Sequence, residues 1–70
     1  NIDGMIFLSP TAVYSFFKKN TINQSVPCFC IGAPTSEAIH LRCNNARFPS
    51  DEPTIESVVD KVINHFSVSA

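Results

Sequence analysis

The chain repeats one local pattern three times: an apolar run, a turn containing Pro and Ser or Thr, and a helix-like segment. The turns are Ser9-Pro10-Thr11, Gly32-Ala33-Pro34-Thr35-Ser36 and Glu52-Pro53-Thr54. Each turn can place unpaired backbone N–H groups at a helix start, where the helix dipole favours anions. The turns after parallel strands gather at one sheet edge, where open α/β sheets bind ligands. The pattern therefore predicts a parallel α/β scaffold with an anion-accepting edge.

The apolar runs predict three short strands, near Met5–Leu8, Val26–Ile31 and Ala46–Phe48. The first run is continuously apolar, which is typical of a strand buried on both faces of a parallel sheet. Ala46–Phe48 is short and is followed by Pro49, so it predicts an edge strand.

Three helices are predicted between and after these runs. Ser9 suits an N-cap with Pro10 at the first helical position, and Lys18 and Lys19 suit the helix end. A second helix is expected from about Pro34 to Cys43, with a weaker apolar pattern. The last helix is capped by Thr54. Its wide apolar stripe consists of Ile55, Val58, Val59, Val62, Ile63 and Phe66.

The resulting βαβαβα order implies a parallel sheet with right-handed crossovers. Seventy residues make at most one domain, and a domain of this size buries only about 60% of its unfolded surface. The chain is 44% hydrophobic and begins at Asn1. We therefore expect a fragment of a longer protein whose apolar faces require neighbours.

Charge and composition exclude several classes of protein. The formal net charge is −1 with scattered basic residues, which argues against nucleic-acid binding. No apolar run approaches the ~20 residues that cross a bilayer. Three cysteines, an odd number without a secreted-scaffold spacing, favour a reducing cytoplasm.

The residues with reactive side chains do not form a catalytic or metal-binding pattern. Cys28 and Cys30 point to one face of a predicted strand, but no second Cys/His pair has zinc spacing, so we expect core packing. His40 and His65 are expected at the surface, and Tyr14 at the rim of the core. No nucleophile–base pair, P-loop or glycine-rich phosphate motif is present. Ser9 and Thr35 remain either helix caps or ligand-binding hydroxyls.

Three segments in order resemble the uroporphyrinogen-III synthase family. Phe7-Leu8-Ser9-Pro10-Thr11-Ala12-Val13, with Phe16 and Phe17, resembles the family's "TSP-(S/T)-A-V…F" segment. Cys30 to Ile39 is similar to "IG-P-T-T-A-x-A-L", and Pro53 to Val59 to the closing "PT-x-E-x-L" helix. Within the second segment Ala33 and Pro34 replace the family's Pro and first Thr, and Leu8 replaces the common Thr before Ser9.

The resemblance implies the C-terminal part of one α/β domain, residues 1–70, in a two-domain enzyme with flavodoxin-like halves. The second domain is absent from this chain. Such enzymes cyclise hydroxymethylbilane, which carries eight carboxylates, to uroporphyrinogen III with loss of water and inversion of ring D. They use no metal or organic cofactor. The proposed catalytic tyrosine of the family lies upstream of the matched region, so its role is not transferred to Tyr14.

On this basis Ser9, Thr11, Gly32 and Thr35 are expected to line the substrate cleft, with no catalytic residue in this chain. The parent enzyme is expected to be a cytoplasmic monomer, and the isolated fragment is expected to be inactive and to self-associate. An alternative from another class is a non-catalytic flavodoxin-like module that binds a protein partner through its apolar helix faces.

Overall fold

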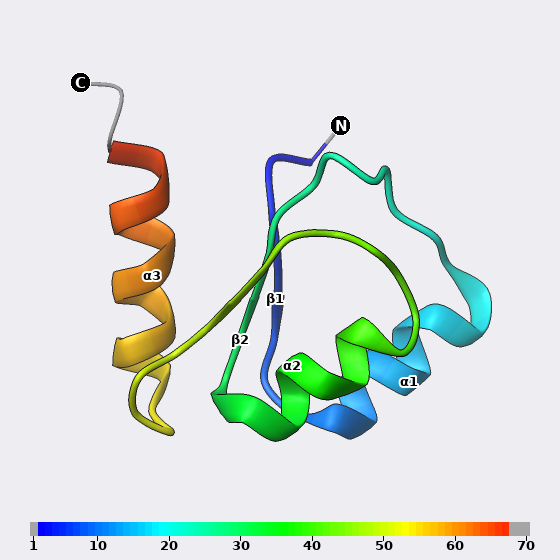
Figure 1. The fold of residues 1–70 in the computed structure, drawn as a ribbon, viewed down its shortest axis with the longest axis horizontal. Coiled ribbons are helices and arrows are strands. Elements are labelled where there is room, and N and C mark those ends of the chain that lie inside the picture. Colours follow the sequence, from blue (N-terminus) through cyan, green and yellow to red (C-terminus); the bar gives the residue numbers. More distant parts are fainter. Residues whose placement is uncertain (1, 68–70) are drawn as a thin grey trace.

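The computed structural model describes residues 2–67. Three strands alternate with three helices along the chain (Figure 1). They are β1 (Met5–Phe7), α1 (Pro10–Lys19), β2 (Cys28–Cys30), α2 (Gly32–His40), β3 (Arg47–Pro49) and α3 (Ile55–Ser67). The βαβαβα order predicted from the sequence is confirmed.

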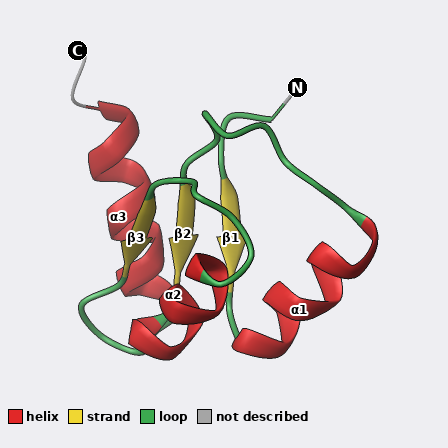
Figure 2. Cartoon of the chain, turned by 45° about the vertical axis from the view of Figure 1, so that its right-hand side comes forward, coloured by secondary structure: helices red, strands yellow, loops and turns green. Residues whose placement is uncertain are grey.

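The three strands form one parallel sheet in the order β1-β2-β3 (Figure 2). Cys28 at the start of β2 pairs with Met5 on one side and with Arg47 on the other. Because all three strands run in one direction, the turns that follow them open on a single edge of the sheet. The prediction of three parallel strands is therefore confirmed.

β1 and β2 are shorter than their apolar runs. Leu8 lies between β1 and the helix cap, and Val26 and Pro27 precede β2. β3 includes Pro49, which the sequence suggested as its end. The Ser50 N–H bonds to the Cys30 oxygen at 2.8 Å, so the neighbouring Pro49 nitrogen is directed to the free side of this edge strand, where a missing N–H costs nothing.

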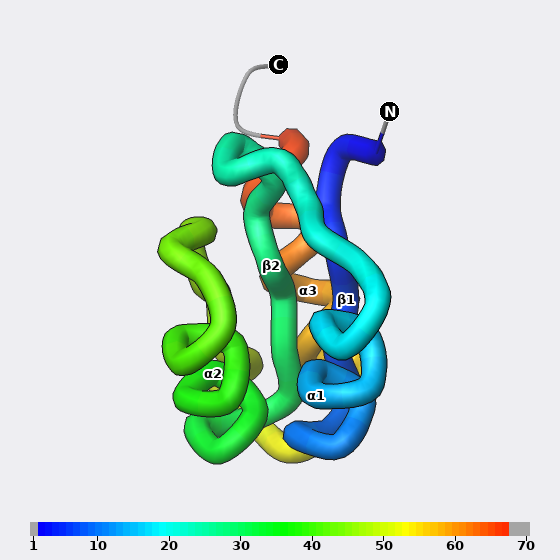
Figure 3. The backbone as a smooth tube through the Cα atoms, turned by 90° about the vertical axis from the view of Figure 1, so that its right-hand side faces the viewer, coloured from blue at the N-terminus to red at the C-terminus, as the bar shows by residue number. Residues whose placement is uncertain are grey.

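The helices cover the two faces of the sheet unequally. α1 and α2 lie side by side on one face, and α3 lies alone on the other (Figure 3). The main core fills the α1/α2 side. Its buried members are Phe7, Val13, Cys28, Cys30, Ala38 and Ile39.

On the α3 side of the sheet, a cluster of aromatic side chains packs the helix against the strands. Phe29 of β2 is 1% exposed and stacks on Phe48 of β3, with ring centroids 5.3 Å apart. His65 and Phe66 of α3 pack against Phe29 at 5.5 and 6.0 Å. Cys28 and Cys30 therefore face α1 and α2, whereas Phe29 between them faces α3, as strand alternation requires.

The expectation about the burial of β1 was wrong. β1 was predicted to be buried on both faces, but Ile6 is 50% exposed and Leu8 46% exposed. The reason is that β1 is at the edge of the sheet and that α3, which covers this face, packs mainly on β2 and β3. In α3, only Val58 of the predicted six-residue stripe is fully buried.

α2 also differs from its predicted bounds. It begins at Gly32 rather than Pro34 and ends at His40, where the Arg42 and Cys43 N–H groups both turn back to the Ile39 oxygen. Its buried face is formed by Thr35, Ala38 and Ile39, spaced i, i+3, i+4. The pattern looked weak in the sequence because its first member is a threonine.

None of the helices in residues 2–67 has the length and apolar character needed to cross a membrane.

Candidate functional site

The three turns at the carboxyl edge of the sheet are tied to one another by the backbone. The Ile31 N–H donates to the Phe7 oxygen at 3.2 Å, which joins the turn after β2 to the end of β1. The Ser50 N–H donates to the Cys30 oxygen at 2.8 Å, which joins the turn after β3 to the end of β2. The predicted site residues thus lie on one connected edge, at the arrowhead ends of the strands in Figure 2.

Ser9 is the N-cap of α1, as predicted. Its Oγ accepts a hydrogen bond from the Ala12 N–H at 3.0 Å, and its carbonyl accepts one from Val13 at 3.3 Å. Pro10 at the first helical position has no N–H to satisfy. Of the first-turn donors, the N–H of Thr11 thus remains for a ligand or water. Thr11 itself is exposed.

Gly32 makes the sharp turn from β2 into α2. Its φ is 70°, in the left-handed region that favours glycine. A Cβ here would meet only the Pro34 Cδ, at 3.6 Å. The backbone conformation, not lack of space, therefore requires a glycine at this turn.

The Gly32 N–H already has a partner in the structure. It donates to Ser50 Oγ at 3.2 Å, and the Ser50 hydroxyl donates to the Glu52 carbonyl at 2.7 Å. Ser50 is only 9% exposed. A residue 18 positions away thus fixes the start of α2 against the turn after β3.

α2 lacks a side-chain cap among the described residues. Its N-cap is Ile31, whose side chain has no hydrogen-bonding group. In a helix the N–H of the fourth residue after the N-cap, here Thr35, pairs with the N-cap carbonyl. Pro34 has no N–H, so the Ala33 N–H is what the first turn offers to an anion. Thr35 is 1% exposed. Its side chain is therefore buried, and a role for its hydroxyl in ligand binding stays a prediction.

Ser50 was missed by the sequence analysis. It follows β3 directly, as Gly32 follows Ile31 after β2 and Ser9 follows Leu8 after β1. Its place one or two residues after a predicted strand is the signal that could have identified it. The sequence analysis used the preceding Pro49 only as the end of the predicted strand.

The turn after β3 is the acidic part of this edge. Asp51 and Glu52 follow Ser50, and Lys61 of α3 lies 3.2 Å from the Asp51 carboxylate. The ion pair is exposed on the Asp51 side and contributes little to stability. Carboxylates in this turn disfavour an anionic ligand, so the turns after β1 and β2 are the better candidates for anion binding.

The cysteines lie in the core, as predicted, and not at this edge. Cys28 and Cys30 are both 0% exposed. Burial, with smaller contributions from the neighbouring thiols of Cys43 and Cys30, raises the pKa of Cys28 from 9.0 to about 12. Burial also raises the pKa of Cys30, partly opposed by the Ser36 hydroxyl and Arg47. Both thiols stay protonated at neutral pH and are poor nucleophiles.

The other titratable candidates are also remote from a catalytic arrangement. His40 and His65 are exposed, as predicted. Tyr14 is 38% exposed, and the Arg42 guanidinium lies 5.0 Å from its ring centre. Within residues 2–67, no three His, Cys, Asp or Glu side chains are grouped so that they could hold a metal ion.

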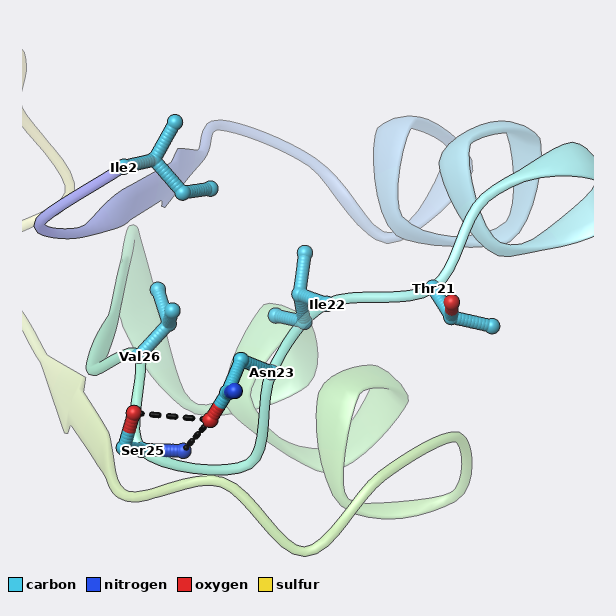
Figure 4. Close-up of a pocket in the computed structure, with 6 residues that line it drawn as sticks. All are labelled: Ile2, Thr21, Ile22, Asn23, Ser25 and Val26. Carbon is cyan, nitrogen blue, oxygen red and sulfur yellow. Dashed lines mark hydrogen bonds between the residues drawn. The ribbon is translucent and has the colours of Figure 1, made fainter.

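A hollow of about 430 Å³ lies between the N-terminal segment and the loop from α1 to β2 (Figure 4). Ile2, Ile22 and Val26 give it apolar walls, and Thr21, Asn23 and Ser25 add polar groups. The Asn23 Oδ1 accepts bonds from the Ser25 N–H at 2.9 Å and the Ser25 hydroxyl at 2.7 Å. Asn23 and Ser25 therefore bond to each other rather than face the hollow as free groups. The hollow is at the opposite end of the strands from the three turns.

The structure thus defines a small parallel α/β domain with a hydroxyl- and amide-lined edge at its strand ends. Comparisons with protein-family models, with curated proteins and with solved structures found no match.

Proposed function

We propose that the chain is the C-terminal part of a uroporphyrinogen-III synthase and contributes one wall of its substrate cleft. The observation that supports this most strongly is the placement of the three family-like segments. They contain the three turns that the parallel sheet brings to one edge, with Ser9, Gly32 and Pro53 respectively. The domain is then part of a flavodoxin-like half of the enzyme, and the other wall belongs to a domain outside this chain.

The chemistry of the edge suits the proposed substrate. Hydroxymethylbilane carries eight carboxylates, and a polyanion of this kind needs many hydrogen-bond donors directed at it. Helix starts supply N–H donors and a positive dipole end without a cluster of fixed charges, in keeping with the net charge of −1. The N–H groups of Thr11 in the first turn and of Ala33 in the second are the donors assigned to substrate carboxylates.

The reaction needs orientation more than a reactive side chain from this domain. Loss of water from the hydroxymethyl carbon leaves an azafulvene cation, which ring D attacks through a spiro intermediate before the macrocycle closes. Binding the carboxylates at fixed points holds the bilane so that ring D reaches the cation. Oriented N–H groups hold those carboxylates without reorganising during the reaction. No metal or cofactor enters this proposal.

The test replaces the corresponding C-terminal segment of an established uroporphyrinogen-III synthase with this chain. The hybrid is supplied with hydroxymethylbilane in a coupled assay, and the ring D-inverted product is measured. We expect the hybrid to make uroporphyrinogen III. The 70-residue chain alone should make none, because half of the cleft is missing. A folded hybrid that binds no substrate and inverts no ring D would contradict the proposal.

Thr35→Val in the hybrid tests the role of the hydroxyl separately. Loss of a hydrogen bond to a charged group costs about 1.5–3 kcal/mol, so a drop in kcat/KM of roughly tenfold or more is expected if the hydroxyl assists binding. Thr54→Val in the acidic third turn is the matched control and should leave kcat/KM unchanged. If Thr35→Val alters the melting temperature alone, Thr35 is only structural and the backbone N–H groups bind the substrate.

A further inference from the structure

α3 presents an apolar surface that no described part of the chain covers. Four of its side chains are 41–61% exposed, although they are all large and apolar. They are Ile55, Val59, Ile63 and Phe66. A helix of a small domain normally buries such residues, and contiguous exposed apolar patches mark interaction sites.

This stripe faces the uncovered half of the sheet. A Cβ on Gly4 would come within 3.6 Å of the Phe66 ring, so Phe66 lies over the start of β1. Ile6 pairs in register with Phe29 and so points to the same side of the sheet, where Phe29 meets α3. Ile6 is 50% exposed. The stripe and Ile6 therefore form one exposed apolar surface between α3 and β1, which we call the groove.

The outer border of the groove is acidic. At about 100° per residue, Glu56 and Asp60 lie next to the Ile55–Val59–Ile63 stripe, on the side away from the buried Val58. Both are exposed. Residues 51–67 contain four carboxylates and one lysine, whereas the other four basic residues precede residue 50. An occupant of the groove thus meets apolar side chains inside and carboxylates at the rim.

We propose that this groove, lined by Ile6 and the four exposed α3 side chains, binds an amphipathic α-helix whose apolar face is bordered by Lys or Arg. Packed helices lie 8–10 Å apart, so an occupant beside α3 covers both the stripe and Ile6. A second copy of this chain does not fit by charge, because its own α3 would set Glu56 and Asp60 against the same carboxylates. The inference does not depend on the synthase activity.

The probe is a pair of fluorescent helical peptides of about 18 residues, long enough to form a helix. They share one leucine stripe and differ only in whether Lys or Glu borders it. Binding to the 70-residue chain is measured by anisotropy. We expect the Lys-bordered peptide to bind about tenfold more tightly than the Glu-bordered one, and we expect added salt to reduce the difference.

Charge reversal in the chain is the decisive variant. Glu56→Lys combined with Asp60→Lys changes two exposed side chains and should invert the preference between the peptides. Glu37→Lys on α2 is the matched control and should leave the preference unchanged. Ile63→Lys should abolish binding, whereas Leu41→Lys, at an equally exposed position beyond the end of α2, should not. Circular dichroism of each variant establishes that the fold is kept.

Several results would overturn the proposal. They are equal affinity for both peptides, no binding of either, and a preference that survives the charge reversal. A dimer in sedimentation that Ile63→Lys dissociates would assign the groove to a second copy instead. If the chain is unfolded alone, folding induced by the Lys-bordered peptide alone supports the proposal, and folding induced equally by both contradicts it.

Discussion

The two faces of the sheet are covered to different extents. On the α1/α2 face, Val13, Cys28, Cys30 and Ile39 are 0% exposed and Ala38 is 2% exposed. On the α3 face, Phe29 and Val58 are 1% exposed, but most of the apolar stripe of α3 remains open to solvent. Among the described residues, the helix with the clearest apolar periodicity is therefore the one that leaves the most large apolar side chains exposed.

The difference shows what apolar periodicity measures. A stripe records that a helix face is to be buried, but not whether the burying surface belongs to the same chain. α2 has a poor stripe and is well buried because the sheet and α1 both pack against it. α3 has a good stripe and only the sheet beneath it. Stability should accordingly depend on the α1/α2 face, and binding should depend on the α3 face.

The largest expected effect comes from truncating matched isoleucines on the two faces. Ile39→Ala creates a cavity in the filled core and should lower the free energy of unfolding by about 2–5 kcal/mol. Ile63→Ala, at a position 56% exposed, should cost less than about 0.5 kcal/mol. Urea denaturation of both variants measures this difference. Equal losses would mean that the two faces are equally well packed.

Ser50 tests the connection between the faces, since it joins the turn leading to α3 with the start of α2. Ser50→Ala leaves the part-buried Gly32 N–H without its acceptor and should cost about 1–3 kcal/mol. Ser25→Ala removes an exposed hydroxyl bonded to Asn23 and should change stability by less than about 0.5 kcal/mol. Thermal melts of the pair decide whether the long-range bond matters more than the local one.

Alkaline pH should weaken the filled face through Cys28. Its pKa is raised by burial to about 12, so the native state keeps the thiol proton at pH values where the unfolded chain has lost it. The stabilisation is complete below pH 9 and is lost as the pH rises toward 12. Raising the pH from 9 to 10 should cost about 1 kcal/mol. Cys28→Ala should flatten this dependence, and an unchanged slope would show that Cys28 is not its origin.

The smallest effects separate the two helix caps. Ser9→Ala removes the Oγ that accepts the Ala12 N–H and should cost about 1 kcal/mol of global stability. Thr54→Ala removes the matching bond from the Ser57 N–H, 3.1 Å long. Because α3 is loosely covered, this loss should appear as faster amide exchange within α3, with less than about 0.5 kcal/mol of global change. Hydrogen exchange measured over a denaturant titration distinguishes a global loss of stability from local opening of α3. A larger global loss from Thr54→Ala than from Ser9→Ala would contradict this prediction.

Much of the local structure could be predicted from the sequence, because it depends on near neighbours in the chain. The caps by Ser9 and Thr54, the lysines at the end of α1 and the alternation of strands and helices all arise from contacts within a few residues. The parallel direction of the strands follows from that alternation, since a helix between two strands returns the chain to the same end of the sheet. The gathering of the three turns at one edge was predictable for the same reason.

Tertiary structure decided which apolar and polar groups meet. The sequence could not show that β1 is an edge strand, that Thr35 completes the buried face of α2, or that Ser50 accepts the Gly32 N–H across 18 residues. Each depends on the order in which strands pair and on the side from which helices cover them. Whether a residue is buried depends on which distant part of the chain packs against it. Periodicity and capping depend only on the residues of the segment itself. The open stripe of α3 is where the two differ most, because the segment is suited to burial and the described chain supplies too little surface to bury it.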